Sequence, residues 1–181
     1  MNTDKLIGNI ADQMIEAQIK LGYARETVRF YYPLASINAL LDTNAQTPSQ
    51  LCALLEKEAA LADSKLGKLT FRVHEGRVEI SVPPEGAEYV YRKLPKPAFL
   101  VDLITLFRTH HACTLNEIKC VFEKYSEDYV CEKMPEGSDF DYVVHFNDVG
   151  IDPYYYCVKE EMGHTIYHRF TKEDYEALLE A

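Results

Sequence analysis

The sequence predicts an α+β fold in which amphipathic helices pack with two antiparallel β-hairpins. Three observations support this class. Apolar residues recur every three or four positions in several segments, which is the spacing of a buried helix face. In other segments apolar and polar residues alternate, as in a strand with one buried face. The segments run as helices, hairpin, helices, hairpin, an order that favours antiparallel sheets.

The first segments of the chain predict two helices. A broad apolar stripe over residues 3–22 predicts an amphipathic helix that ends at Gly22, because glycine commonly terminates helices. In the segment 23–33, Pro33 disfavours helical geometry at Tyr32. The same proline suits a first helical turn, so a short helix is expected from there through Leu41.

A third helix and a hairpin follow. Thr47 can cap a helix whose first turn holds a proline, and Gln50 can reach back to complete a capping box. This helix is expected to run to about Lys65. Alternation with a period of two over 69–73 and 78–82 then predicts a β-hairpin that two prolines end.

The second half of the chain begins at a boundary marked by Pro95 and Pro97. We expect it to contain helices over 97–111 and 114–125, an acidic loop over 126–139, a strand over 140–146, a hairpin of 154–159 and 164–170, and a terminal helix from Thr171. Two helices followed by a hairpin and a helix also fit a winged-helix-like arrangement. The chain is interpreted as a single domain over 1–181, with lobes 1–94 and 95–181 as a subdivision.

Charge is distributed unevenly along the sequence. The chain has 19 Lys and Arg against 29 Asp and Glu residues, a formal charge of −10. Residues 1–111 balance at 13 basic and 13 acidic side chains, whereas 112–181 hold 6 and 16. Non-specific affinity for nucleic acid comes from Lys and Arg, so no nucleic-acid partner is expected.

The location expected from the sequence is cytoplasmic. No window of 18 consecutive apolar residues and no secretory signal pattern occurs, so no membrane partner is expected either. Five cysteines without a Cys-x-x-Cys pair indicate reduced thiols rather than a disulfide scaffold. The sequence leaves the oligomeric state open.

Well-marked catalytic and cofactor motifs are absent from the sequence. It lacks the G-x-G-x-x-G, P-loop, H-E-x-x-H, G-x-S-x-G and EF-hand patterns, and no cofactor is expected. The residues His110, His111 and Cys113 offer metal-binding atoms. Structural zinc sites use ligands in tight pairs, and no second pair is present, so we expect no metal site.

The candidate binding residues of the first half are two arginines and two tyrosines. Arg25 and Arg29, four residues apart, would form an anion-binding face if their segment is helical. Tyr31 and Tyr32 carry rings with polar tips, which suit ligand or partner surfaces. Pairing of the arginines with the acidic second half is the other interpretation, and we favour it.

The candidates of the second half lie in the predicted strands. Neighbours in the run 154–156 must face opposite sides of a sheet, and Tyr155 is the tyrosine expected to face a partner. His168 shares a strand face with His164, and His145 lies in the preceding strand. These histidines either move protons near neutral pH or are structural, and we favour the structural role.

Three strings of sequence are distinctive: IKLGYARETVRFYYPL at 19–34, DPYYYC at 152–157, and TIYHRF at 165–170 followed by Asp174 and Tyr175. Together they resemble an uncharacterised bacterial family catalogued as a domain of unknown function. The resemblance spans nearly the whole chain. It implies a bacterial cytosolic protein and carries over no catalytic residue.

Two functional hypotheses follow from the sequence. The first is a non-enzymatic interaction or regulatory module with an unknown protein or small-molecule partner, which the lack of a catalytic signature favours. The second is a small-molecule enzyme with a site between the lobes, where Arg25 and Arg29 hold an anionic substrate and His145 or His168 moves a proton.

Overall fold

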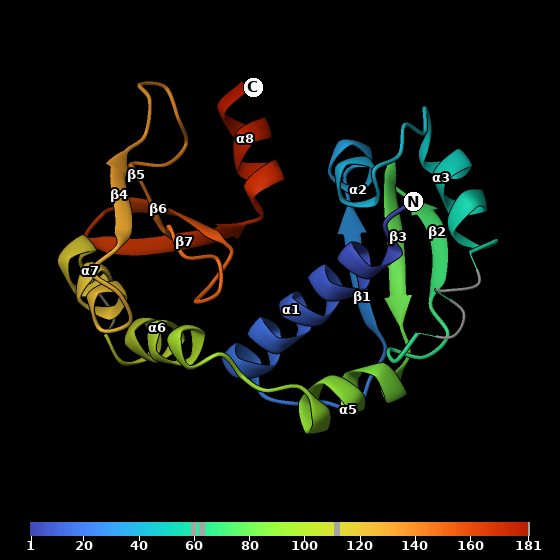
Figure 1. Ribbon diagram of the computed structural model, residues 1–181, viewed down its shortest axis with the longest axis horizontal. Coiled ribbons are helices and arrows are strands. Elements are labelled where there is room, and N and C mark those ends of the chain that lie inside the picture. The colour runs from blue at the N-terminus through green and yellow to red at the C-terminus, as the bar shows by residue number, and fades with distance from the viewer. Residues whose placement is uncertain (59–60, 62–63, 111–112, 181) are drawn as a thin grey trace. The chain divides into compact units, whose positions relative to one another are not determined.

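A computed structural model of the chain describes residues 1–58, 61, 64–110 and 113–180 (Figure 1). It confirms the predicted α+β class, because helices accompany two antiparallel sheets, one of three strands and one of four. The chain divides into two compact units, unit 1 (Met1–Lys96) and unit 2 (Pro97–Ala181). Each unit has its own hydrophobic core and is described by itself.

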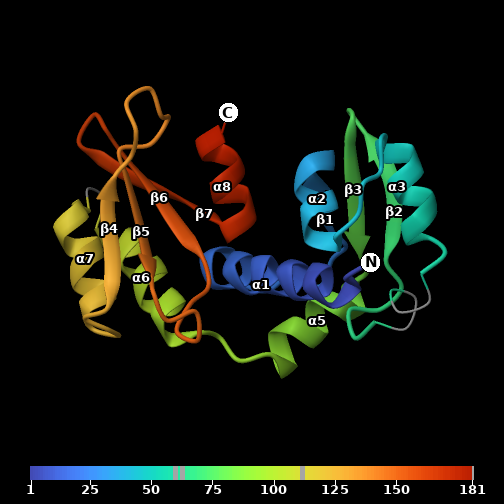
Figure 2. The same ribbon diagram turned by 45° about the horizontal axis from the view of Figure 1, so that its top comes forward.

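Unit 1 packs helices on one face of a three-stranded antiparallel sheet with the strand order β1-β3-β2 (Figure 2). Val78, Ile80 and Val82, on the inner side of the central strand, are completely buried among helix side chains. The strands are β1 (Val28–Tyr32), β2 (Thr70–His74) and β3 (Arg77–Val82), and the helices are α1 (Thr3–Leu21), α2 (Leu34–Leu41), α3 (Pro48–Leu55) and α5 (Pro84–Lys93).

Side-chain caps fix where two helices of unit 1 begin. The Thr47 side chain accepts a hydrogen bond from the backbone nitrogen of Gln50 (3.2 Å), as the sequence predicts for the start of α3. The Gln50 side chain reaches back one residue further than predicted, to the backbone nitrogen of Gln46 (2.9 Å). At the start of α1, the Asn2 side chain accepts a hydrogen bond from the backbone nitrogen of Lys5 (3.2 Å).

The helix predicted to run to about Lys65 ends at Leu55 instead. Just after this point, the backbone nitrogens of residues 57 and 58 bond to carbonyl oxygens three residues back (3.2 and 3.1 Å). Such bonds tighten the last turn of a helix and terminate it. Residues 59–60 and 62–63 of the predicted helix lie outside the described residues.

Two further elements of unit 1 lie in segments for which the sequence predicts no helix or strand. The segment 23–33 is not helical, because it contains strand β1, in which Val28 and Phe30 pack on the core while Arg29 is exposed. Helix α5 was not predicted. Pro84 occupies its first turn, so the proline pair that ends β3 also starts the next helix.

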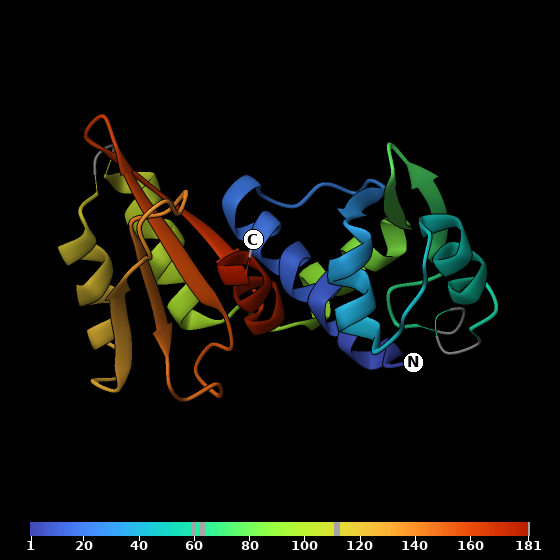
Figure 3. The same ribbon diagram turned by 90° about the horizontal axis from the view of Figure 1, so that it is seen from above.

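Unit 2 is a four-stranded antiparallel meander, in the order β4-β5-β6-β7, with helices on both faces (Figure 3). On one face, Phe99 packs edge to face on Phe146 and Tyr156, with ring centroids 4.8 and 5.6 Å apart. On the other, Tyr175 stacks on Tyr155 at 4.7 Å. The elements are α6 (Ala98–Thr109), α7 (Leu115–Glu123), β4 (Tyr129–Lys133), β5 (Tyr142–Phe146), β6 (Tyr155–Glu161), β7 (His164–Phe170) and α8 (Lys172–Glu180).

The sequence expectation for unit 2 holds except in one segment. The capping box at Thr114 and Glu117 is confirmed, since each side chain accepts a hydrogen bond from the other residue's backbone nitrogen. The segment 126–139, expected to be a loop, contains β4. Its residues Tyr129 and Cys131 pack on the core beside α6 and α7. The hairpin β6-β7 is half of a larger, four-stranded sheet. The winged-helix-like arrangement stays a prediction.

The described residues also bear on a membrane role. Among them, no helix combines the length and the apolar character needed to cross a bilayer.

Helix α5 lies very close to neighbouring parts of unit 1 at Gly86. A Cβ atom there would lie 2.5 Å from Cγ1 of Val82 and even closer to the carbonyl oxygen of Leu66. Gly86→Ala should therefore lower the free energy of unfolding by about 1–3 kcal/mol, the usual result of overpacking. Chemical denaturation of the full chain, followed by circular dichroism, measures this change.

Gly8→Ala is the matched control. Gly8 lies within helix α1 on its exposed side, and nothing lies within 4 Å of the added Cβ. It should stabilise unit 1 by about 0.5–1 kcal/mol through helix propensity. Equal effects of the two substitutions would contradict the close approach of α5.

Candidate functional site

The side of the unit 1 sheet that faces away from the helices carries a group of polar side chains, which we call the outer face. Strand register brings these residues together. Tyr31 of β1 and Arg72 of β2 both stand opposite Glu79 of β3, one on each side. The outer face consists of Arg29, Tyr31, Thr70, Arg72, His74, Arg77, Glu79 and Ser81.

Glu79 lies at the centre of the outer face and is completely buried. Its Oε1 atom is 2.8 Å from Nε of Arg72 and 3.7 Å from Nε of Arg29. The Ser81 hydroxyl donates a hydrogen bond to the same oxygen (3.1 Å). Long side chains from the neighbouring strands thus cover a carboxylate that sits on the solvent side of the sheet.

The contact with Arg72 is the main influence on the ionisation of Glu79. The hydrogen bond from Arg72 holds the pKa of Glu79 below its ordinary value, and partial desolvation opposes this effect. The same hydrogen bond raises the pKa of Arg72. Glu79 is therefore a carboxylate at neutral pH.

The second carboxylate oxygen of Glu79 has a different environment. Oε2 lies 4.0 Å from Nδ1 of His74 and accepts no hydrogen bond from the described residues. The His74 ring in turn lies 5.2 Å from the ring of Tyr31. One oxygen of Glu79 thus holds the arginines, while the other faces an aromatic pair.

The two arginines use only part of their hydrogen-bonding capacity on Glu79. Their side chains remain 52% (Arg29) and 63% (Arg72) exposed. Each guanidinium group has five N–H donors, so several donors on each face solvent. The outer face carries three arginines and one glutamate, whereas the whole chain has a formal charge of −10.

Arg29 and Tyr31 are the predicted binding residues that belong to the outer face. Tyr32 faces the core instead, where its hydroxyl donates to Oδ1 of Asn9 (2.8 Å) and accepts from Gln13 (3.1 Å). Arg25 precedes β1 and lies 3.7 Å from Glu88. Because their segment is not helical, Arg25 and Arg29 do not share a helix face.

The predicted residues of unit 2 lie on the face of the sheet that carries α8. Tyr155 is half-buried between Tyr175 and His145, whose ring centroids are 4.7 and 4.2 Å from its own. The His168 ring packs 5.3 Å from Phe140. The set that the enzyme hypothesis requires is divided between the units, so neither unit contains it by itself.

A buried ion pair in unit 2 was not predicted. Nη2 of Arg169 lies 3.5 Å from Oδ2 of Asp152, and the two side chains are 5% and 2% exposed. The Arg169 guanidinium lies 3.6 Å above the ring of Tyr154, whose backbone nitrogen donates to Asp152 Oδ1 (3.0 Å). These residues belong to two of the distinctive strings, 152–157 and 165–170. The contacts between them join the start of β6 to β7.

The metal hypothesis finds no support in the described part of the chain, which contains no group of three His, Cys, Asp or Glu residues arranged to hold an ion. His111 lies outside the described residues. Nδ1 of His110 lies 2.8 Å from the carboxylate of Glu117, the capping residue of α7.

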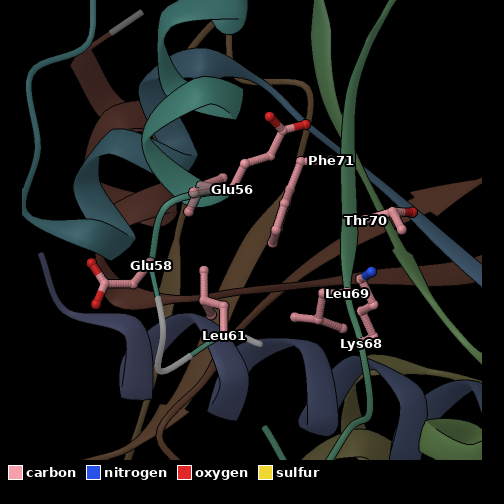
Figure 4. Close-up of a pocket in the computed structure, with 8 residues that line it drawn as sticks. Glu56, Glu58, Leu61, Lys68, Leu69, Thr70 and Phe71 are labelled. Atoms are coloured by element: carbon pink, nitrogen blue, oxygen red, sulfur yellow. The ribbon is translucent and has the colours of Figure 1, made fainter. Parts of the chain in front are cut away.

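A hollow of about 290 Å³ lies between the end of α3 and the start of β2 (Figure 4). Leu61, Leu69 and Phe71 contribute apolar walls, and Glu56 and Glu58 lie at its margin. None of the predicted site residues lines this hollow. The outer face therefore remains the strongest candidate site.

Comparison with known protein families identifies a family to which the chain is similar. The family model DUF3877, described as a domain of unknown function with an E. rectale gene description, matches residues 3–179. No curated protein and no solved structure matches the chain.

Glu79→Gln tests the central contact of the outer face. The substitution removes the negative charge while preserving shape, so it should destabilise unit 1 at pH 7. Because the folded-state pKa of Glu79 is lowered, its stabilising contribution is complete above the ordinary value of 4.5 and disappears as the pH falls through the folded-state pKa. The difference between variant and wild type should accordingly shrink below pH 4.5 in urea denaturation curves.

The matched control for this prediction is Glu75→Gln, in the exposed turn between β2 and β3. It should leave stability nearly unchanged at both pH values. A Glu79→Gln effect that stays constant with pH would show that the carboxylate charge is not what stabilises the sheet.

Asp152→Asn tests the ion pair of unit 2. Asparagine keeps an oxygen that can accept from the Tyr154 backbone nitrogen but removes the negative charge that lies 3.5 Å from the buried Arg169 guanidinium. Breaking a buried pair in this way should cost about 3 kcal/mol, whereas Glu161→Gln, at an exposed pair, should cost less than about 0.5 kcal/mol. Denaturation midpoints that move equally in both variants would refute the distinction.

Proposed function

The chain belongs to the DUF3877 family of domains of unknown function, and we propose that it is a non-enzymatic interaction module that binds a partner protein through the outer face of unit 1. The observation that carries this proposal is the arrangement around Glu79. A buried carboxylate fixes two arginines on an open sheet face and leaves most of their donors directed to solvent.

The chemistry of the outer face favours binding over catalysis. The outer-face hydroxyl group that lies nearest to a carboxylate belongs to Ser81, and it donates a hydrogen bond to Glu79. The lowered pKa of Glu79 makes this carboxylate a weak base near neutral pH, whereas general bases work best with a pKa close to the working pH. Ser81 is therefore not activated as a nucleophile by its neighbour.

The composition of the face also fits a protein partner. Arginine and tyrosine are enriched in protein interfaces, because both combine apolar contact with directional hydrogen bonds. Tyr31 and Arg72 project from opposite sides of Glu79 and are exposed. A flat, open sheet face offers little enclosure to a small molecule, which usually binds in a concave pocket.

Charge argues against nucleic acid as the partner. Unit 2 contains 7 basic and 17 acidic residues, so it contributes the entire formal charge of −10 and would repel a phosphate backbone. Three arginines on one face are too few to offset this repulsion over a long polyanion.

Site-specific photo-crosslinking tests the proposal. A benzophenone amino acid at position 31, on the outer face, should give one predominant adduct in an extract of the source cells, detected by intact-mass analysis. The same group at position 54, an exposed site on α3 in the other layer of unit 1, should not give that adduct.

Introducing Arg77→Gln into the position 31 variant should reduce the yield of the adduct at least fivefold. The captured protein, once purified, should bind the wild-type chain at least tenfold more tightly than it binds the Arg77→Gln variant. The ion pairs of Glu79 with arginine are formed by Arg29 and Arg72, so the substitution of Arg77 leaves both pairs in place. Equal labelling from positions 31 and 54, or binding indifferent to Arg77, would overturn the assignment of the outer face as the binding surface.

A further inference from the structure

We propose that the outer face recognises a phosphorylated serine or threonine side chain of its partner protein. This inference rests on the proposed function and specifies the chemical group that the outer face binds. Three features of the face support it: the convergence of Arg29 and Arg72, the excess of positive charge, and the donors contributed by all three strands.

The convergence of two guanidinium groups is the first feature. Arg29 and Arg72 come from strands on opposite sides of β3, yet both place Nε near the same oxygen of Glu79. Two like charges held this close repel each other, and the single charge of Glu79 offsets only part of that repulsion. An anion above the pair would offset the remainder.

The amount of unbalanced charge points to a dianion. Arg29, Arg72 and Arg77 provide three positive charges against the one negative charge of Glu79. A phosphorylated side chain carries about −1.5 to −2 at pH 7, whereas a carboxylate carries only −1. Glu75, in the adjoining turn, is the nearest acidic residue in sequence to His74, and it is exposed to solvent.

The donors of the outer face have the chemistry that a phosphate group requires. A phosphomonoester presents three terminal oxygens in different directions, and arginine forms paired, charge-assisted hydrogen bonds to such oxygens. On the outer face, donors stand on all three strands: Arg29 on β1, Arg72 on β2 and Arg77 on β3. The exposed ring of Tyr31 beside them can contact the peptide that carries the phosphate.

Glu79 has a positioning role in this scheme. Because it is buried and lies 2.8 Å from Nε of Arg72, it holds the guanidinium group in place through that nitrogen, while the Arg72 side chain stays 63% exposed. A protein that pre-organises its arginines in this way loses less side-chain entropy when the phosphate binds.

The test uses three peptides on the full chain, with the sequence acetyl-Gly-Ala-X-Ala-Gly-amide and X as phosphoserine, serine or glutamate. NMR titration should show saturable shifts of the backbone amides of β1, β2 and β3 with the phosphoserine peptide. Its affinity should exceed that of the glutamate peptide at least fivefold and that of the serine peptide at least twentyfold.

Variants locate the binding. Arg72→Gln and, independently, Arg77→Gln should each weaken binding of the phosphoserine peptide at least fivefold. Arg92→Gln should leave it unchanged, because Arg92 is an exposed arginine of α5 paired with Glu88 in the same unit. Arg77→Gln keeps the inference testable if Arg72→Gln does not fold.

The outcomes separate this inference from the proposed function. Equal affinity for the phosphoserine and glutamate peptides, absence of binding, or binding that survives both outer-face variants would each overturn phosphate recognition. Tight binding of phenyl phosphate with no gain from the peptide would point to a small-molecule ligand and would likewise overturn it. If photo-crosslinking at position 31 gives the expected adduct while the phosphoserine peptide does not bind, the proposed interaction module is supported and only phosphate recognition is refuted.

Discussion

The ion pairs around Glu79 organise the solvent side of unit 1. A carboxylate in the middle strand of a three-stranded sheet has neighbours on both sides, and here each side supplies an arginine to the same oxygen. The hydrogen bond from Arg72 and the longer ion pair with Arg29 link three strands through side chains, in addition to the backbone ladder. The inner side of the same strand is purely aliphatic, so β3 separates an apolar core from a charged surface.

The cores of the two units are built from different kinds of side chains. In unit 1 the core is mainly aliphatic, with leucine and isoleucine from the helices against valine and isoleucine of β3. In unit 2 the rings of Phe99, Phe122, Phe146 and Tyr156 form the centre, and a buried Arg169–Asp152 pair lies in the segments that lead into β6 and along β7. Aromatic edge-to-face contacts have preferred geometries, so this core specifies the position of α6 and α7 more tightly than aliphatic packing alone would.

The sequence predicts those parts of the fold that depend on neighbours along the chain. Short-range patterns can be identified directly in the sequence because they involve only a few neighbouring residues. Examples are the helix cap formed by Thr114 with Glu117 and the alternation over 78–82. Strand β1 was missed because its partner β3 lies about fifty residues away, and its five-residue alternation is short. The candidate site shows the same limit: Arg29 and Tyr31 stood out, but Arg72, His74 and Glu79 join them only through strand register, which no local pattern reveals.

The approach of α5 to the sheet at Gly86 has a consequence for how this family can vary. Because a Cβ atom at position 86 would lie 2.5 Å from Cγ1 of Val82 and even closer to the Leu66 carbonyl oxygen, the lack of a side chain there allows α5 to lie as close to these groups as it does. Among relatives, a larger residue at 86 should appear only alongside a displaced helix, because the Leu66 carbonyl belongs to the backbone and a smaller residue at 82 would relieve only the contact with Val82. A side chain at this position would thus identify a relative in which α5 lies farther from the backbone around residue 66.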